Sequence, residues 1–100
     1  MAQLNNSGSF TGTGSSAAFK PEEGFFAVSF GGGSGTVKLE RSRDGSTWFD
    51  VSKDQDGNAA SYAITGEEMA FDVFQSDGEM RWRLTCAVYT SGTIDWQMSQ

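Results

Sequence analysis

A long alternation of side chains over residues 80–89 constrains the fold of this chain more than any other feature. One side of the alternation carries Met80, Trp82, Leu84, Cys86 and Val88, and the other carries Arg81, Arg83, Thr85, Ala87 and Tyr89. Because successive side chains of a strand point to opposite faces, this period of two predicts a half-buried central β-strand. Shorter alternations at 24–30, 36–42, 47–52, 59–65, 69–74 and 94–98 predict further strands.

Turn residues separate these segments. Asp44-Gly45, Ser76-Asp77-Gly78 and Ser91-Gly92 have the residue types that tight hairpin turns require, because they tolerate positive φ. A chain of 100 residues is long enough for one domain, and three Leu with no helical periodicity argue against a helical bundle. We predict an all-β domain, an antiparallel two-sheet β-sandwich or jelly-roll of about seven or eight short strands.

The first twenty residues have a different composition. They interleave Gly and Ser with isolated apolar residues, a pattern too polar for a buried helix. Pro21 biases the preceding residue towards extended geometry and marks the boundary. We predict an extended N-terminal arm over residues 1–20 and a β-sandwich domain over residues 21–100. One strand of the arm, at 10–13 or 17–20, either pairs with the sandwich or lies on a neighbouring molecule.

Charge and composition exclude several functions. The net charge of −6 makes nucleic acid and anionic membranes poor partners. The polar N-terminus does not resemble a signal peptide, and no apolar run is long enough to cross a bilayer, so we expect synthesis in the cytoplasm. A single cysteine and the lack of histidine exclude an internal disulfide and a thiolate zinc cluster.

No motif in the sequence indicates catalysis. Asp54 and Asp56 alternate as oxygen donors do in calcium loops, but the downstream Glu of such loops is missing, and a turn explains them. Asp44 falls in a turn, and Cys86 is expected to be a small buried residue. We therefore expect no enzymatic activity, no cofactor and no metal site.

Surplus aromatic residues indicate contacts with another molecule. Some of these aromatic residues lie on the strand face opposite to that of their core neighbours, and others lie in the predicted arm. In addition, two arginines share the outward face of the central strand. These arginines are either ordinary surface residues or pair with an acidic residue on an adjacent strand or on a partner subunit. The candidate partner contacts are Phe10, Phe19, Phe25, Phe74, Arg81, Arg83 and Tyr89.

Two segments resemble small structural proteins of tailed bacteriophage particles. The first is GTVKLERSRDGSTWFDV at 35–51, and the second is RWRLT at 81–85 followed by YTSGT at 89–93 and a final strand. The resemblance extends over residues 24–100 and implies a non-enzymatic virion component on the capsid surface. The expected function is that of a head decoration or cement subunit that bridges neighbouring capsid subunits.

The resemblance also implies partners and leaves alternatives. The expected partners are the major capsid protein or other virion proteins and copies of the chain itself, in a homo-oligomer such as a trimer. A head-tail connector or tail component is the alternative within the same class. From a different class, a glycan-binding or adhesive sandwich would stack sugars on Trp48, Phe49 or Tyr89.

Overall fold

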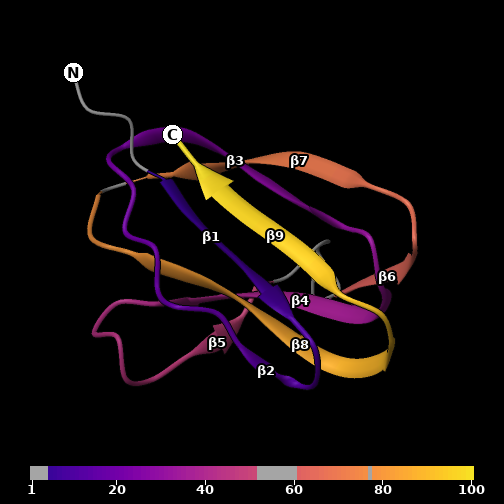
Figure 1. Cartoon of the computed structure of the whole chain (residues 1–100). Helices are drawn as coiled ribbons and strands as arrows, with labels where there is room; N and C mark the ends of the chain where they lie inside the picture. The colour runs from indigo at the N-terminus through magenta and orange to yellow at the C-terminus, as the bar shows by residue number, and fades with distance from the viewer. Residues whose placement is uncertain (1–4, 52–60, 77) are drawn as a thin grey trace.

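The protein is a sandwich of two antiparallel β-sheets (Figure 1). A computed structural model describes residues 5–51, 61–76 and 78–100. One sheet has the order β1-β9-β3-β7 and is called the β9 sheet below. The other has the order β2-β8-β4-β5, with β6 also paired to β4, and is called the β8 sheet. The strands are β1 Asn5–Phe10, β2 Gly14–Ser15, β3 Gly24–Gly31, β4 Ser34–Ser42, β5 Phe49–Asp50, β6 Ser61–Thr65, β7 Met69–Gln75, β8 Arg81–Ser91 and β9 Ile94–Ser99.

This architecture confirms the predicted all-β two-sheet sandwich. The described residues form nine strands instead of seven or eight, because the N-terminal segment adds β1 and the very short β2. No helix long and apolar enough to span a membrane occurs in this part of the chain.

The core lies between the two sheets and follows the predicted alternation. Phe26, Val28 and Phe30 of β3 are buried, whereas Phe71 on the edge strand β7 is only partly buried and packs against them. Burial of alternate apolar side chains from both sheets supplies the main favourable free energy of folding. The remaining buried apolar residues of the core are Phe10, Phe19, Val37, Leu39, Ile64, Trp82, Leu84, Cys86, Ile94, Trp96 and Met98.

The β8 strand departs from the predicted alternation after Cys86. The β4 residues that pair with Cys86 and Val88 are neighbours in the chain, so Ala87 is an extra residue on β8. Such a bulge shifts the alternation by one position. The prediction for the end of this strand was therefore wrong: Val88 is 54% exposed, and Tyr89 is partly buried and packs against the core.

Gly35 on β4 allows the two strands to approach closely at this bulge. A Cβ atom at position 35 would collide with the carbonyl oxygen of Val88, which is backbone and has little freedom to move. Only glycine fits this position without a shift of β4 away from β8.

The predicted turn at Asp44-Gly45 is present between β4 and β5. Gly45 has φ of +82°, and Oδ1 of Asp44 accepts hydrogen bonds from the amides of Ser46 and Thr47, each at 2.8 Å, and from the Ser42 hydroxyl at 3.0 Å. The bonds from Thr47, Ser46 and Ser42 stabilise the charged carboxylate and lower the pKa of Asp44 to about 2. This side chain holds the turn together.

In its described part, residues 5–20, the segment predicted as an arm pairs with the sandwich, which was one of the two alternatives, but at 5–10 and 14–15 instead of 10–13 or 17–20. β1 pairs with β9 along its whole length, and β2 pairs with β8. Phe19 exchanges backbone hydrogen bonds with Trp82, at 2.7 and 2.8 Å. Residues 5–20 therefore contribute one strand to each sheet and are continuous with the sandwich predicted for residues 21–100.

The small residues of this segment explain how so polar a sequence joins the sandwich. Gly8 lies opposite Trp96, and a Cβ atom at position 8 would lie 2.8 Å from the indole ring. The glycine makes room for the Trp96 ring, while Phe10 and Phe19 extend the core, each 5% exposed.

Candidate functional site

An exposed aromatic pair lies on the outer face of the β9 sheet. Phe25 of β3 and Phe74 of β7 are directly opposite each other in the strand register, and they are 67% and 52% exposed. Their ring centroids are 5.0 Å apart at an interplanar angle of 61°, an edge-to-face arrangement. Two of the predicted partner contacts are therefore brought together at the surface of the molecule.

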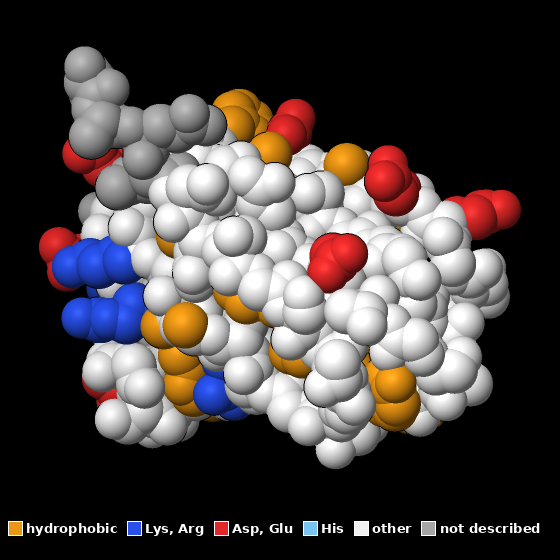
Figure 2. All heavy atoms as spheres, in the orientation of Figure 1, with side chains coloured by type: hydrophobic (Ala, Val, Ile, Leu, Met, Phe, Trp, Pro, Cys, Tyr) orange, Lys and Arg blue, Asp and Glu red, His pale blue; other side chains and the backbone are white. Residues whose placement is uncertain are grey.

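The rest of this outer face carries small and acidic side chains. An open depression of about 840 Å³ is lined by residues that include Ser7, Ser9, Ser29, Glu68 and Asp95. In Figure 2 the face carries mainly white atoms with separate red carboxylates, and the blue side chains lie towards the left and lower parts of the view. Beside its aromatic pair, the outer face of the β9 sheet therefore carries separate carboxylates among small side chains.

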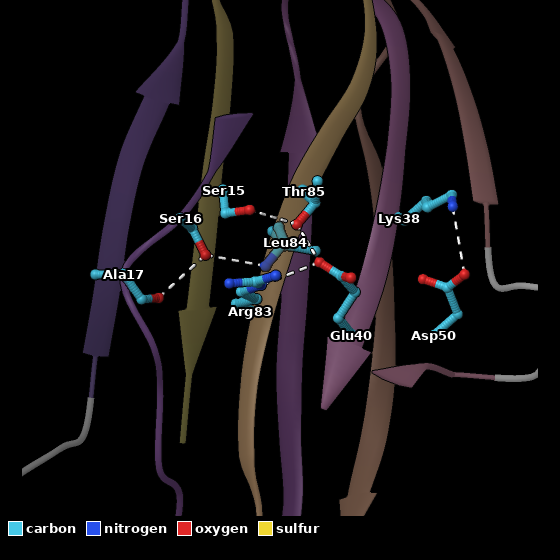
Figure 3. Close-up of polar contacts among 9 residues, drawn as sticks. All are labelled: Ser15, Ser16, Ala17, Lys38, Glu40, Asp50, Arg83, Leu84 and Thr85. Atoms are coloured by element: carbon cyan, nitrogen blue, oxygen red, sulfur yellow. Dashed lines mark hydrogen bonds and ion pairs between the residues drawn. The ribbon is translucent and has the colours of Figure 1, made fainter. Parts of the chain in front are cut away.

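The outer face of the β8 sheet has a different chemistry, a row of paired polar side chains (Figure 3). Arg83 Nε lies 3.0 Å from Glu40 Oε1, which also accepts a hydrogen bond from the Thr85 hydroxyl. The hydroxyls of Thr85 and Ser15 are 2.8 Å apart. The row links β2, β8 and β4 into one surface.

Both predicted arginine contacts are engaged within the chain. Arg83 pairs with Glu40 on the adjacent strand, and its guanidinium carbon lies 4.3 Å from the centre of the Trp48 ring, in a cation–π contact. Arg81 donates a hydrogen bond from Nη1 to the carbonyl oxygen of Arg43, at 2.7 Å. Of the two pairings that the sequence left open, Arg83 adopts the one with an adjacent strand.

The other three predicted contacts lie in or against the core of the chain. Phe10 and Phe19 are buried because the N-terminal segment belongs to the sandwich. Tyr89 is turned towards the core by the bulge, and its hydroxyl donates a hydrogen bond to the carbonyl oxygen of Gly92, at 2.6 Å. These three aromatic side chains contact their own chain, and the surface candidates reduce to Phe25 and Phe74.

The three aromatic residues of the sugar-stacking alternative do not form one platform. Trp48 is half-buried beneath Arg83, whereas Phe49 is 64% exposed. Tyr89 pairs with Gly35, and Phe49 pairs with Arg41, six residues further along β4. At about 3.3 Å per residue, this separation is about 20 Å.

A buried glutamine was missed by the sequence reasoning. Trp82 donates a hydrogen bond from Nε1 to Gln75 Oε1, at 3.0 Å. Gln75 Nε2 donates to the carbonyl oxygens of Met80, at 2.8 Å, and Pro21, at 3.2 Å. Gln75 occupies the next inward position after Phe71 and Val73 in the alternation of β7, and this spacing could have predicted its burial. The network is structural, because all of its bonds fix backbone or core groups.

The titratable groups in and against the core do not form a second candidate functional site. Burial raises the pKa values of the Cys86 thiol and the Tyr62 phenol. No group of three or more acidic or cysteine side chains that could hold a metal ion occurs within the described ranges. The loop with Asp54 and Asp56 lies outside the described residues.

No protein-family model and no curated protein matches the sequence. Among solved structures, the chain is similar to the Drosophila melanogaster CENP-C cupin domain, with a TM-score of 0.42 and 9% identity over 96% of this chain and 58% of that one. It is also similar to the Yersinia pseudotuberculosis-derived mitogen, with a TM-score of 0.46 and 14% identity over 98% of this chain and 83% of that one. Neither similarity indicates a function for this chain.

Proposed function

We propose that the protein is a non-enzymatic structural subunit of a tailed phage particle, a head decoration or cement subunit that bridges neighbouring capsid subunits. The observation that carries the proposal is the exposed Phe25–Phe74 pair on the outer face of the β9 sheet. The resemblance of residues 24–100 to small phage structural proteins supplies the biological setting. The proposed partners are the major capsid protein and further copies of the chain.

The aromatic pair has the properties of a small binding hot spot. Covering the exposed parts of two phenylalanine rings removes roughly 200 Å² of apolar surface from water, which is worth about 5 kcal/mol before the costs of association. The edge-to-face contact between the two rings restrains both side chains, which reduces the side-chain entropy lost on binding. A single site of this size is weak, and a homo-oligomer that presents several linked copies of the site would compensate through multivalency.

The proposal is tested on purified particles of the phage whose genome encodes the chain. A decoration subunit is expected in hundreds of copies per particle, whereas a connector or tail ring holds about six or twelve, as closed cyclic symmetry requires. Quantitative mass spectrometry against the major capsid protein gives the copy number. Absence of the chain from the particles would overturn the proposal, and six or twelve copies would assign the chain to the neck or tail.

A variant pair tests the role of the aromatic residues. Phe25→Ala/Phe74→Ala protein is expected to lose binding to particles that lack the chain, measured by co-sedimentation. Phe49→Ala is the matched control, because Phe49 is equally exposed but belongs to the β8 sheet. Equal binding by the double variant and the wild type would refute the role of this pair.

A further inference from the structure

The positive charges of the strands are confined to one of the two sheets. The strands of the β9 sheet contain no Lys or Arg, whereas β4 and β8 contain Lys38, Arg41, Arg81 and Arg83. The turn before β7 adds Glu67 and Glu68 to the acidic side. The strands of the β9 sheet therefore face their surroundings without positive charge.

The negative charges of the carboxylates on this side are not neutralised by nearby positive charges. Glu67, Glu68, Asp72 and Asp95 are exposed, and none of them forms an ion pair within the described part of the chain. Asp95 accepts a hydrogen bond from the Ser9 hydroxyl at 2.8 Å, which orients the carboxylate without neutralising it. The negative potential over this face is available to a partner.

The shape of the face provides a place for a cationic side chain. The depression of about 840 Å³ is lined by Glu68 and Asp95, by small residues such as Ser29, and by parts of the apolar residues Phe30, Met69 and Trp96. Ser29 is four residues from Phe25 on β3, a separation of about 13 Å along the strand. An acidic hollow and an aromatic pair thus lie on one face, within the span of a single partner surface.

We propose that the outer face of the β9 sheet docks a protein surface that presents Lys or Arg beside an apolar side chain. The cation enters the depression next to Glu68 and Asp95, and the apolar side chain packs on Phe25 and Phe74. This inference rests on the proposed function and deepens it, because it states the chemistry of the partner. Its test requires no phage particle.

A second copy of the chain does not fit this surface as well as a basic partner does. Each copy carries a net charge of −6, so two copies repel each other. On the outer face of the β8 sheet, Lys38 and Arg83 are already paired with Asp50 and Glu40. The partner must supply its own positive charge.

The binding test uses a defined probe. A fluorescein-labelled peptide that alternates Lys and Leu is titrated into the full-length protein, and ¹⁵N chemical shifts locate the site. We expect shifts at Ser29, Ala70 and Asp95, and weaker binding at higher salt because the contact is electrostatic. The same peptide with Glu in place of Lys should not bind.

Paired variants separate the local charge from the net charge. Glu68→Gln/Asp95→Asn should weaken binding of the Lys peptide roughly three- to tenfold, as the loss of two exposed charge contacts implies. Asp50→Asn/Glu79→Gln changes the net charge equally, away from this face, and should leave the affinity within about twofold.

Three outcomes would overturn the inference: binding of the Glu peptide, shifts on the β8 sheet, or dimerisation through the β9 face in the absence of peptide, seen by sedimentation. If the peptide fails to bind while the chain is present on particles, the inference fails and the proposed function stands. If the peptide binds as expected and the chain is absent from particles, the surface assignment stands and the phage function fails.

Discussion

Replacement of Phe19 by alanine tests whether the N-terminal segment belongs to the core. Phe19 is 5% exposed, and its ring centroid lies 5.6 Å from that of Phe26, which in turn lies 5.3 Å from that of Trp82. Phe19→Ala leaves a cavity beside these rings. If residues 5–20 were a separate arm, the same substitution would leave the sandwich unaffected.

The expected loss is large relative to the stability of such a domain. Removing a buried phenylalanine ring costs about 3–5 kcal/mol, from the lost transfer free energy and the cavity. A domain of this size has a free energy of unfolding of about 5–15 kcal/mol. At about 4–8 °C per kcal/mol, the Tm should fall by roughly 12–40 °C.

Urea unfolding followed by tryptophan fluorescence measures this loss, with Phe25→Ala as the control. Phe25 is 67% exposed, so its replacement should cost at most about 1 kcal/mol although the chemical change is identical. A Phe19→Ala protein within about 1 kcal/mol of the wild type, or one that is no less stable than Phe25→Ala, would refute the assignment of Phe19 to the core.

Three further substitutions test local features of the fold. Gln75→Leu should lower the free energy of unfolding by about 1–3 kcal/mol in urea, because Trp82 Nε1 loses its acceptor in a buried site. Gly35→Ala should cost about 1–3 kcal/mol in the same assay, because the new Cβ collides with the carbonyl of Val88. Asp44 has a lowered folded-state pKa, so its stabilisation is present above about pH 4 and is lost as the pH falls towards 2. The difference in urea midpoint between the wild type and Asp44→Asn should therefore shrink over that interval.

Each of these expectations has a contradicting result. A Gln75→Leu protein as stable as the wild type would show that the buried network adds no stability. An unchanged midpoint for Gly35→Ala would show that the bulge can move without cost. A constant difference between the wild type and Asp44→Asn from pH 4 to pH 2 would show that the turn does not lower the pKa of this carboxyl.

Local patterns predicted the fold class because they depend on neighbouring residues. The alternation of Phe26, Val28 and Phe30 identified an inward face, and the Asp44-Gly45 pair identified a turn. These features need only the period of a strand and the φ preferences of turn residues. These local features were sufficient to predict two sheets with a core between them.

The predictions that failed concern features that depend on contacts between residues far apart in the sequence. Nothing near Ala87 marks it as a bulge, because the extra residue is defined by pairing with β4. The burial of Phe10 and Phe19 depends on β9 and β8, which lie at the other end of the sequence. The exposed pair was predicted residue by residue, but the register that places Phe25 opposite Phe74 became known only from the fold.

The pairing of β1 with β9 also determines when the protein can fold during synthesis. Asn5 pairs with Ser99, and β9 lies between β1 and β3 in its sheet. The ribosome must therefore release residues 94–99 before the sheet can close, and the earlier strands wait with apolar faces exposed. A nascent chain of this kind depends on late, long-range pairing, which is slow and leaves it open to aggregation or to capture by chaperones.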